Sequence, residues 1–134
     1  MKHEESEAQQ ALFEWAALMR GVWPELELMY HVPNGGKRSP SEAARLKAEG
    51  VRAGVPDIVL PAARGGYFGL YIEMKTEDGR LSGAQEEYIP KLEAQNYAVI
   101  VCRSFGEAKN TIERYLGWGA TEAPGKRGRY YGKL

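Results

Sequence analysis

The sequence predicts an α/β fold with a central mixed β-sheet flanked by helices. Three observations lead to this prediction. Segments with apolar residues at helical spacing alternate along the chain with short apolar runs of strand length. A serine stands where three of these helices would begin. Finally, 134 residues are enough for one domain with its own core.

The first expected helix covers residues 6–20, before Gly21 and Pro24 end it. Its apolar residues share one face, which we expect to be buried: Ala8, Ala11, Leu12, Trp15, Leu18, Met19 and Val22. Residues 26–32 alternate weakly in polarity and predict a strand that runs into the loop 33–36.

A second, short helix is expected to begin at Pro40 and to stop at Gly50. Ser39 would be its N-cap, and Glu42 would complete a capping box. Proline suits the first helical position because no N–H donor is needed there.

Two strands are expected next, at residues 55–60 and 67–75, joined by a loop at 62–66. A third helix should follow Ser82 and run toward Asn96. Ser82 and Gln85 form a second capping-box pattern. Pro90 lies inside this helix and is expected to kink it.

Residues 98–102 are almost all apolar, which is typical of a strand covered on both faces. The single cysteine, Cys102, should be a small core residue in a reducing compartment. Ser104 would cap a last helix that Gly117 ends. The apolar residues of that helix are Phe105, Ala108, Ile112, Tyr115 and Leu116.

We expect one domain over residues 1–117 and a basic, aromatic C-terminal tail over 118–134. The chain has 18 basic and 18 acidic residues, so no global field attracts nucleic acid. Basic residues nevertheless cluster in residues 31–54 and in the tail, and local patches are sufficient for binding phosphates. The tail composition suits stacking on single strands or junctions, and equally a dimer arm or a disordered segment.

No apolar run approaches the ~20 residues of a membrane span, so we expect no membrane partner. The N-terminal segment is acidic and lacks the apolar core of a signal peptide. We therefore expect a cytoplasmic protein.

Asp57, Glu73 and Lys75 form the most informative pattern of the chain. Asp57 follows a proline at the start of one expected strand. Glu73 and Lys75 lie on the next strand and, being two residues apart, project from the same face. Two carboxylates that converge there repel each other unless a cation joins them, and Mg²⁺ or Mn²⁺ prefers such oxygen ligands. A Glu-x-Lys triplet alone is usually a solvated ion pair, but the whole pattern indicates a metal-assisted phosphodiesterase.

These residues resemble the VRR-NUC (virus-type replication-repair nuclease) branch of the PD-(D/E)xK superfamily. The resemblance runs from about Glu7 to Leu116 and rests on five segments in order: 7–10, 31–36, 54–57, 72–75 and 81–85. It implies a restriction-endonuclease-like core and a deoxyribonuclease that depends on Mg²⁺ or Mn²⁺. Stand-alone phage and bacterial members look like homodimers that resolve four-way (Holliday) junctions, whereas larger members act in crosslink repair. The implied partners are therefore branched DNA and a second copy of the chain, in a bacterial or phage-infected cell.

The resemblance also implies roles for individual residues. Asp57 and Glu73 would be metal ligands, with the Met74 backbone carbonyl as a third oxygen and Glu7 acting through water. Lys75 would position or deprotonate the attacking water and stabilise the phosphate. Because the neighbouring carboxylates keep a lysine charged, we favour electrostatic stabilisation.

Other assignments have simple alternatives. Gln85 would orient the water in the active site, or it is only a helix cap. Glu4 could replace Glu7 one turn earlier, and Gln10 would face the same way as Glu7. A lone histidine such as His31 is more often structural.

Expected DNA-binding residues are all small, polar or basic: Asn34, Gly35, Gly36, Lys37, Arg38, Arg52, Lys126, Arg127 and Arg129. Such contacts with phosphates set affinity and position rather than sequence preference. The alternative for the segment 34–38 is an ordinary surface loop.

The function we expect is a structure-specific DNA endonuclease. One alternative is a non-catalytic DNA-binding module on a nuclease fold, which the complete Asp57, Glu73 and Lys75 set disfavours. The other is a restriction-type, sequence-specific endonuclease, which we rank lower because the sequence has no helix-turn-helix or zinc-finger pattern.

Overall fold

Four short strands form one mixed sheet in the computed structural model, which describes residues 3–33 and 37–122. The strands lie in the order β1 (Tyr30–His31), β2 (Ile58–Leu60), β3 (Leu70–Met74) and β4 (Ala98–Cys102). β1, β2 and β3 are antiparallel neighbours, whereas β3 and β4 are parallel. The helices are α1 (His3–Leu18), the short 3₁₀ helix η1 (Pro24–Leu28), α2 (Pro40–Ala48), α3 (Gly83–Ala94) and α4 (Phe105–Leu116). The predicted mixed sheet flanked by helices is confirmed.

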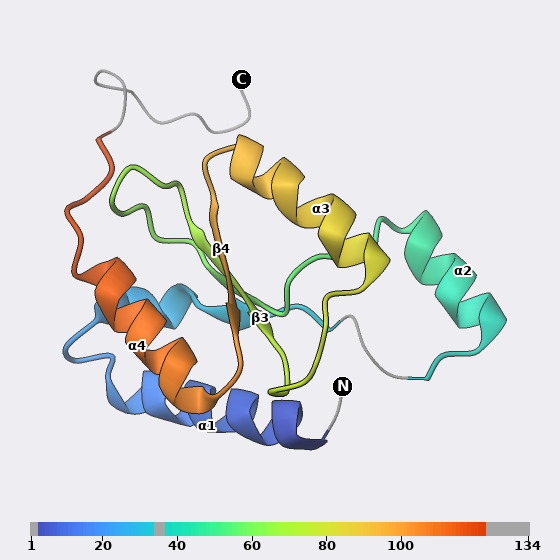
Figure 1. Ribbon diagram of the computed structural model, residues 1–134, viewed down its shortest axis with the longest axis horizontal. Coiled ribbons are helices and arrows are strands. Elements are labelled where there is room, and N and C mark those ends of the chain that lie inside the picture. The colour runs from blue at the N-terminus through green and yellow to red at the C-terminus, as the bar shows by residue number, and fades with distance from the viewer. Residues whose placement is uncertain (1–2, 34–36, 123–134) are drawn as a thin grey trace.

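The alternation of side chains along β3 divides the molecule into two layers. Leu70, Ile72 and Met74 are buried in the main core, which contains residues of α1 and α4. Glu73 points to the opposite face, where α3 supplies Gln85. Figure 1 shows α1 and α4 along the lower left of the sheet and α3 along its upper right. None of the helices in the described part of the chain has the length and apolarity to cross a membrane.

Serine N-caps begin three helices, as predicted. Ser39, Ser82 and Ser104 each accept a hydrogen bond from the backbone N–H three residues later. The reciprocal capping box is complete at Ser82 and Gln85, whereas α2 shows the bond from Glu42 N–H to Ser39. α3 runs on through Pro90 to Ala94.

The predicted strand at residues 26–32 is mostly wrong. Residues 24–28 form η1, which begins at Pro24, and only Tyr30 and His31 are in a strand. Leu26 and Met29, three residues apart, are buried, while Leu28 is 54% exposed. A spacing of three residues is the period of a 3₁₀ helix. The weak alternation in polarity was therefore not the period of a strand.

Two burial predictions also need correction. The apolar face of α1 was expected to continue through Leu18 and Val22, but the helix ends at Leu18, and these side chains are 84% and 62% exposed. β4 was expected to be covered on both faces, but it is at the edge of the sheet, and Ile100 is 40% exposed. Cys102 at the end of β4 is buried, as predicted.

Candidate active site

The pairing of β2 with β3 brings Asp57 next to Glu73. Ile58 pairs with Ile72, so Asp57 and Glu73 lie one residue beyond the pair on the two antiparallel strands. The Asp57 backbone N–H donates to Glu73 Oε1 at 3.2 Å, and the Met74 N–H donates to Asp57 Oδ2 at 3.0 Å. Each carboxylate is thus held by the backbone of the other strand.

The second oxygen of Glu73 connects the pair to two further polar side chains. Gln85 Nε2 donates to Glu73 Oε2 at 2.8 Å, and Lys75 Nζ lies 3.4 Å from the same oxygen. Glu73 is only 2% exposed. The four residues Asp57, Glu73, Lys75 and Gln85 therefore form one cluster on the α3 side of the sheet.

Burial dominates the electrostatics of this cluster. Burial, the largest cause, and the charge of Asp57 together raise the pKa of Glu73 from 4.5 to about 7, while Lys75 and the hydrogen bond from Gln85 act in the opposite direction. Burial also raises the pKa of Asp57, against the hydrogen bond from Met74 and the charges of His31 and Lys75. Burial therefore disfavours the ionised form of both carboxyl groups, that of the buried Glu73 and that of the partly buried Asp57.

The donor set fits a hard divalent cation. A cation held by Asp57 and Glu73 would offset the repulsion from Asp57 that helps to raise the pKa of Glu73. Among residues 3–33 and 37–122, no group of three or more His, Cys, Asp or Glu side chains is placed to hold a metal. An ion here would need backbone or water oxygens as well, as Mg²⁺ commonly does. The Met74 carbonyl ligand remains a prediction.

The structure places Glu7 away from this cluster. Its carboxylate lies 2.8 Å from His3 Nε2 on the exposed side of α1, and its side chain is 64% exposed. Gln10, expected on the same face, bonds to Ser6. The acid of α1 whose charge raises the pKa of Asp57 is Glu5.

Gln9 lies one turn after Glu5 and shares its face of α1. The side-chain oxygen of Gln9 is buried and has no hydrogen-bond partner among the described residues. The buried residues of the helix, Leu12 and Ala16, lie on the same face as Gln9. Counting back from them by three or four residues could have identified Gln9 and Glu5.

His31 has a positioning role that the sequence did not reveal. Its Nδ1–H donates to the backbone carbonyl of Asp57 at 2.9 Å, and the Val32 N–H donates to the same oxygen at 2.6 Å. Because a carbonyl oxygen only accepts, Nδ1 carries the proton in this arrangement. These two bonds fix the backbone from which the Asp57 side chain projects.

The predicted DNA-binding residues are only partly described. Lys37 and Arg52 are exposed, and Arg38 donates to the Pro33 carbonyl at 2.8 Å. The other six lie outside the described residues: Asn34, Gly35, Gly36, Lys126, Arg127 and Arg129.

Comparisons with known proteins agree with this geometry. The VRR-NUC domain matches residues 3–106. A solved structure described as "VRR_NUC domain protein" is 30% identical and superposes with a TM-score of 0.75, covering 90% of this chain and 93% of that chain. No curated protein matches the chain. The domain match extends over most of the chain and includes Asp57, Glu73, Lys75 and Gln85, and the chain therefore belongs to the VRR-NUC family of nucleases.

Proposed function

We propose that the protein is a divalent-metal-dependent endonuclease that hydrolyses phosphodiester bonds in branched DNA, with four-way junctions as the expected substrate. The observation that carries the proposal is the contact of Asp57, Glu73, Lys75 and Gln85 on one face of the sheet. Acidic side chains alone would repel a phosphate. With a cation and Lys75 beside them, the same group can stabilise the charge of the reacting phosphate.

Each side chain has a distinct task in this proposal. Asp57 and Glu73 would hold Mg²⁺ or Mn²⁺, and Glu5 rather than Glu7 would add negative charge from α1. The bound ion would supply charge neutralisation and a more acidic water. Lys75 is 15% exposed, and its Nζ lies 3.4 Å from Glu73 Oε2, a position that suits the stabilisation of phosphate oxygens.

Gln85 is both a helix cap and a member of the cluster, the two alternatives that its position in the sequence allowed. Its Oε1 accepts from the Ser82 N–H at 2.9 Å, while its Nε2 donates to Glu73 Oε2 at 2.8 Å. The capping box thereby orients the amide that holds Glu73. The same side chain serves the helix and the cluster.

Replacement of Gln85 by glutamate should separate these tasks. A glutamate can still accept from the Ser82 N–H, so the helix cap should be retained, but it brings another carboxylate against the buried Glu73 and should destabilise the fold at neutral pH by about 1–3 kcal/mol. It cannot donate to Glu73, and we expect cleavage to fall at least about tenfold. Urea unfolding and single-turnover cleavage measure the two effects. Glu86→Gln, an exposed change next in the helix, is the control. Normal cleavage by Gln85→Glu would reduce Gln85 to a helix cap.

A second copy of the chain completes the proposal for junctions. One domain has one candidate site, and symmetric cleavage of a four-way junction needs two. A two-fold homodimer is the simplest way to provide them.

The test compares cleavage of a four-way junction, a flap and a plain duplex in Mg²⁺, Mn²⁺ or EDTA. We expect cutting of the branched substrates with either metal and none in EDTA. Lys75→Ala should lower the rate by at least about 100-fold. Lys91→Ala removes an exposed lysine 3.8 Å from Glu87 and should leave the rate unchanged.

Three outcomes would contradict the proposal in different ways. Undiminished cleavage by Lys75→Ala would remove the active site assigned here. Junction binding without metal-dependent cutting would favour a non-catalytic DNA-binding module. Cutting only at particular duplex sequences would favour a restriction-type enzyme.

A further inference from the structure

Helix α2 stands apart from the core and has no buried residue. In Figure 1 it extends to the right, beyond the first turn of α3. Hydrogen bonds nevertheless close the C-terminal end of α2. Gly50, with φ of +106°, donates from its N–H to the Lys47 carbonyl at 3.1 Å, and Val51 N–H donates to the Leu46 carbonyl at 3.0 Å. These are the two bonds of a Schellman motif, which brings the side chains of Leu46 and Val51 together.

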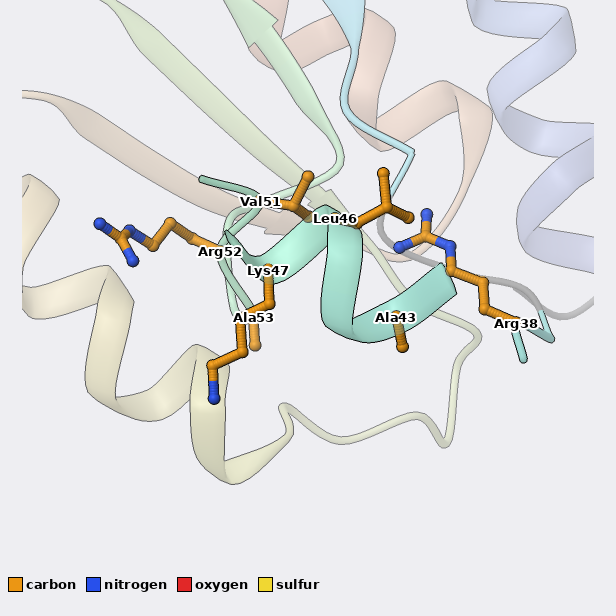
Figure 2. Close-up of a pocket in the computed structure, with 7 residues that line it drawn as sticks. All are labelled: Arg38, Ala43, Leu46, Lys47, Val51, Arg52 and Ala53. Atoms are coloured by element: carbon orange, nitrogen blue, oxygen red, sulfur yellow. The ribbon is translucent and has the colours of Figure 1, made fainter. Parts of the chain in front are cut away.

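A cavity of about 310 Å³ opens around this apolar pair. Its lining residues are Arg38, Ala43, Leu46, Lys47, Val51, Arg52 and Ala53. Figure 2 shows the Leu46 and Val51 side chains pointing the same way, with Arg38 and Arg52 on opposite sides of them. We call this cavity the α2 pocket. It has an apolar floor between two guanidinium groups.

The basic side chains of the α2 pocket are available to a ligand. Within the part of the chain that the structure describes, the side chains of Lys47 and Arg52 make no hydrogen bond or ion pair, and the Arg38 side chain donates only to the Pro33 carbonyl. The neighbouring Arg45, by contrast, is paired with Glu49 at 3.1 Å. Unpaired guanidinium groups are good donors to phosphate oxygens, and their planes can stack on a base.

The α2 pocket is connected to the candidate active site by a short segment of the chain. Asp57 follows Ala53, the last residue of the lining, by four positions. Between them, Gly54 packs against the backbone of Ala84, the residue before Gln85. DNA that places a phosphate at Asp57 and Glu73 therefore has its neighbouring nucleotides within reach of α2.

We propose that the α2 pocket holds one unpaired nucleotide of the strand that is cut. Its flanking phosphates would contact Arg38 and Arg52, and its sugar and base would cover Leu46 and Val51. The proposal rests on DNA being the substrate of the neighbouring site, as proposed above. It adds a physical reason for the preference for branched DNA.

Size and chemistry favour an unpaired nucleotide over a paired one. The volume is at the lower end of the roughly 300–1,000 Å³ of small-ligand pockets, so it fits a single nucleotide rather than a helical segment. A paired base is stacked inside the duplex, which offers only phosphates and sugars to this surface. The apolar floor would then have no partner. Branched DNA supplies unpaired nucleotides at the branch point.

The test measures binding in EDTA, where no cutting is expected, by fluorescence anisotropy. The probes are a forked duplex with a short unpaired arm and a blunt duplex with the same base pairs. Arg52→Gln should weaken binding of the fork about five- to tenfold. The double change Leu46→Gln with Val51→Thr keeps all charges and should weaken the fork about fivefold while leaving the blunt duplex unchanged. Arg20→Gln, an exposed basic residue beyond the end of α1, should affect neither probe.

Two results would overturn the inference. One is a floor variant, Leu46→Gln with Val51→Thr, that leaves binding of the fork unchanged or weakens both probes equally. The other is an Arg52→Gln variant that behaves like Arg20→Gln. The fold should tolerate both changes, because Arg52 is exposed, Val51 is 39% exposed, and Leu46 belongs to α2, which has no buried residue. A different result would contradict the proposed function alone. A wild-type protein that prefers the fork through this pocket but cuts no DNA in Mg²⁺ would retain the pocket and lose the endonuclease activity.

Discussion

Replacement of Glu73 by glutamine is expected to abolish metal-dependent cleavage and to reduce the pH dependence of stability in the metal-free protein. The loss of cleavage follows because a neutral amide is a poor ligand for Mg²⁺ beside Asp57. Metal-ion catalysis contributes several kcal/mol, so the rate should fall at least about 10³-fold.

The effect on stability follows from the raised pKa of Glu73. The carboxyl is 2% exposed, and its pKa rises from 4.5 to about 7 on folding. The folded protein therefore binds this proton more tightly than the unfolded chain does. The resulting stabilisation is complete below about pH 4.5 and is lost as the pH rises to about 7. Its size is on the order of 3 kcal/mol at most.

Urea unfolding at pH 5 and pH 8, with EDTA or with Mg²⁺, measures these effects. In EDTA the wild type should be less stable at pH 8, and Glu73→Gln should show a much smaller difference. At pH 8, Mg²⁺ should stabilise the wild type but not the variant, because the ionised Glu73 would hold the ion together with Asp57, whereas the amide would not. The change of unfolding free energy with pH is more informative than its absolute value. The amide of Glu73→Gln directs an N–H₂ group toward the Gln85 Nε2 donor, which lowers stability at every pH. The control is Glu87→Gln, on a side chain that is 78% exposed. Identical pH slopes and identical responses to Mg²⁺ in wild type and Glu73→Gln would contradict the assignment.

The features that the sequence predicted well depend on local geometry. The side-chain period of a strand was enough to place Glu73 and Lys75 on one face. A serine side chain and an N–H three residues later were enough to locate the starts of α2, α3 and α4. These relations hold for any chain that adopts the element, whatever packs around it.

The features that the sequence did not predict depend on packing between elements. Glu5 and Glu7 are both acids in the first turns of α1. Only the rotation of the helix against the sheet determines that the charge of Glu5 acts on Asp57, while Glu7 pairs with His3 on the exposed side. The apolar run of β4 does not encode its position at the edge of the sheet, where Ile100 is exposed. The hydrogen bond from His31 to the Asp57 carbonyl needs the pairing of β1 with β2, which places distant parts of the chain side by side.

The same dependence on packing makes Gly54 the most sensitive glycine near the site. We expect Gly54→Ala to destabilise the fold by more than about 3 kcal/mol and to lower cleavage strongly. Its φ is +89°, which costs an L-residue roughly 1–2 kcal/mol. In addition, a Cβ there would overlap the carbonyl group of Ala84, at 2.6 Å from the carbon, and this backbone cannot rotate away as a side chain would.

Gly66→Ala is the matched control for the backbone strain. Gly66 has a similar φ of +92°, but a Cβ there would meet nothing within 4 Å. It should therefore lose only the roughly 1–2 kcal/mol of the conformational term in urea unfolding and retain cleavage. In Gly54→Ala, relief of the overlap must move the first turn of α3, and with it the Gln85 amide, away from Glu73. If the two variants are equally stable and cut DNA equally well, the contact between residue 54 and α3 does not hold the site together, and the link drawn here between the Asp57 segment and the start of α3 is wrong.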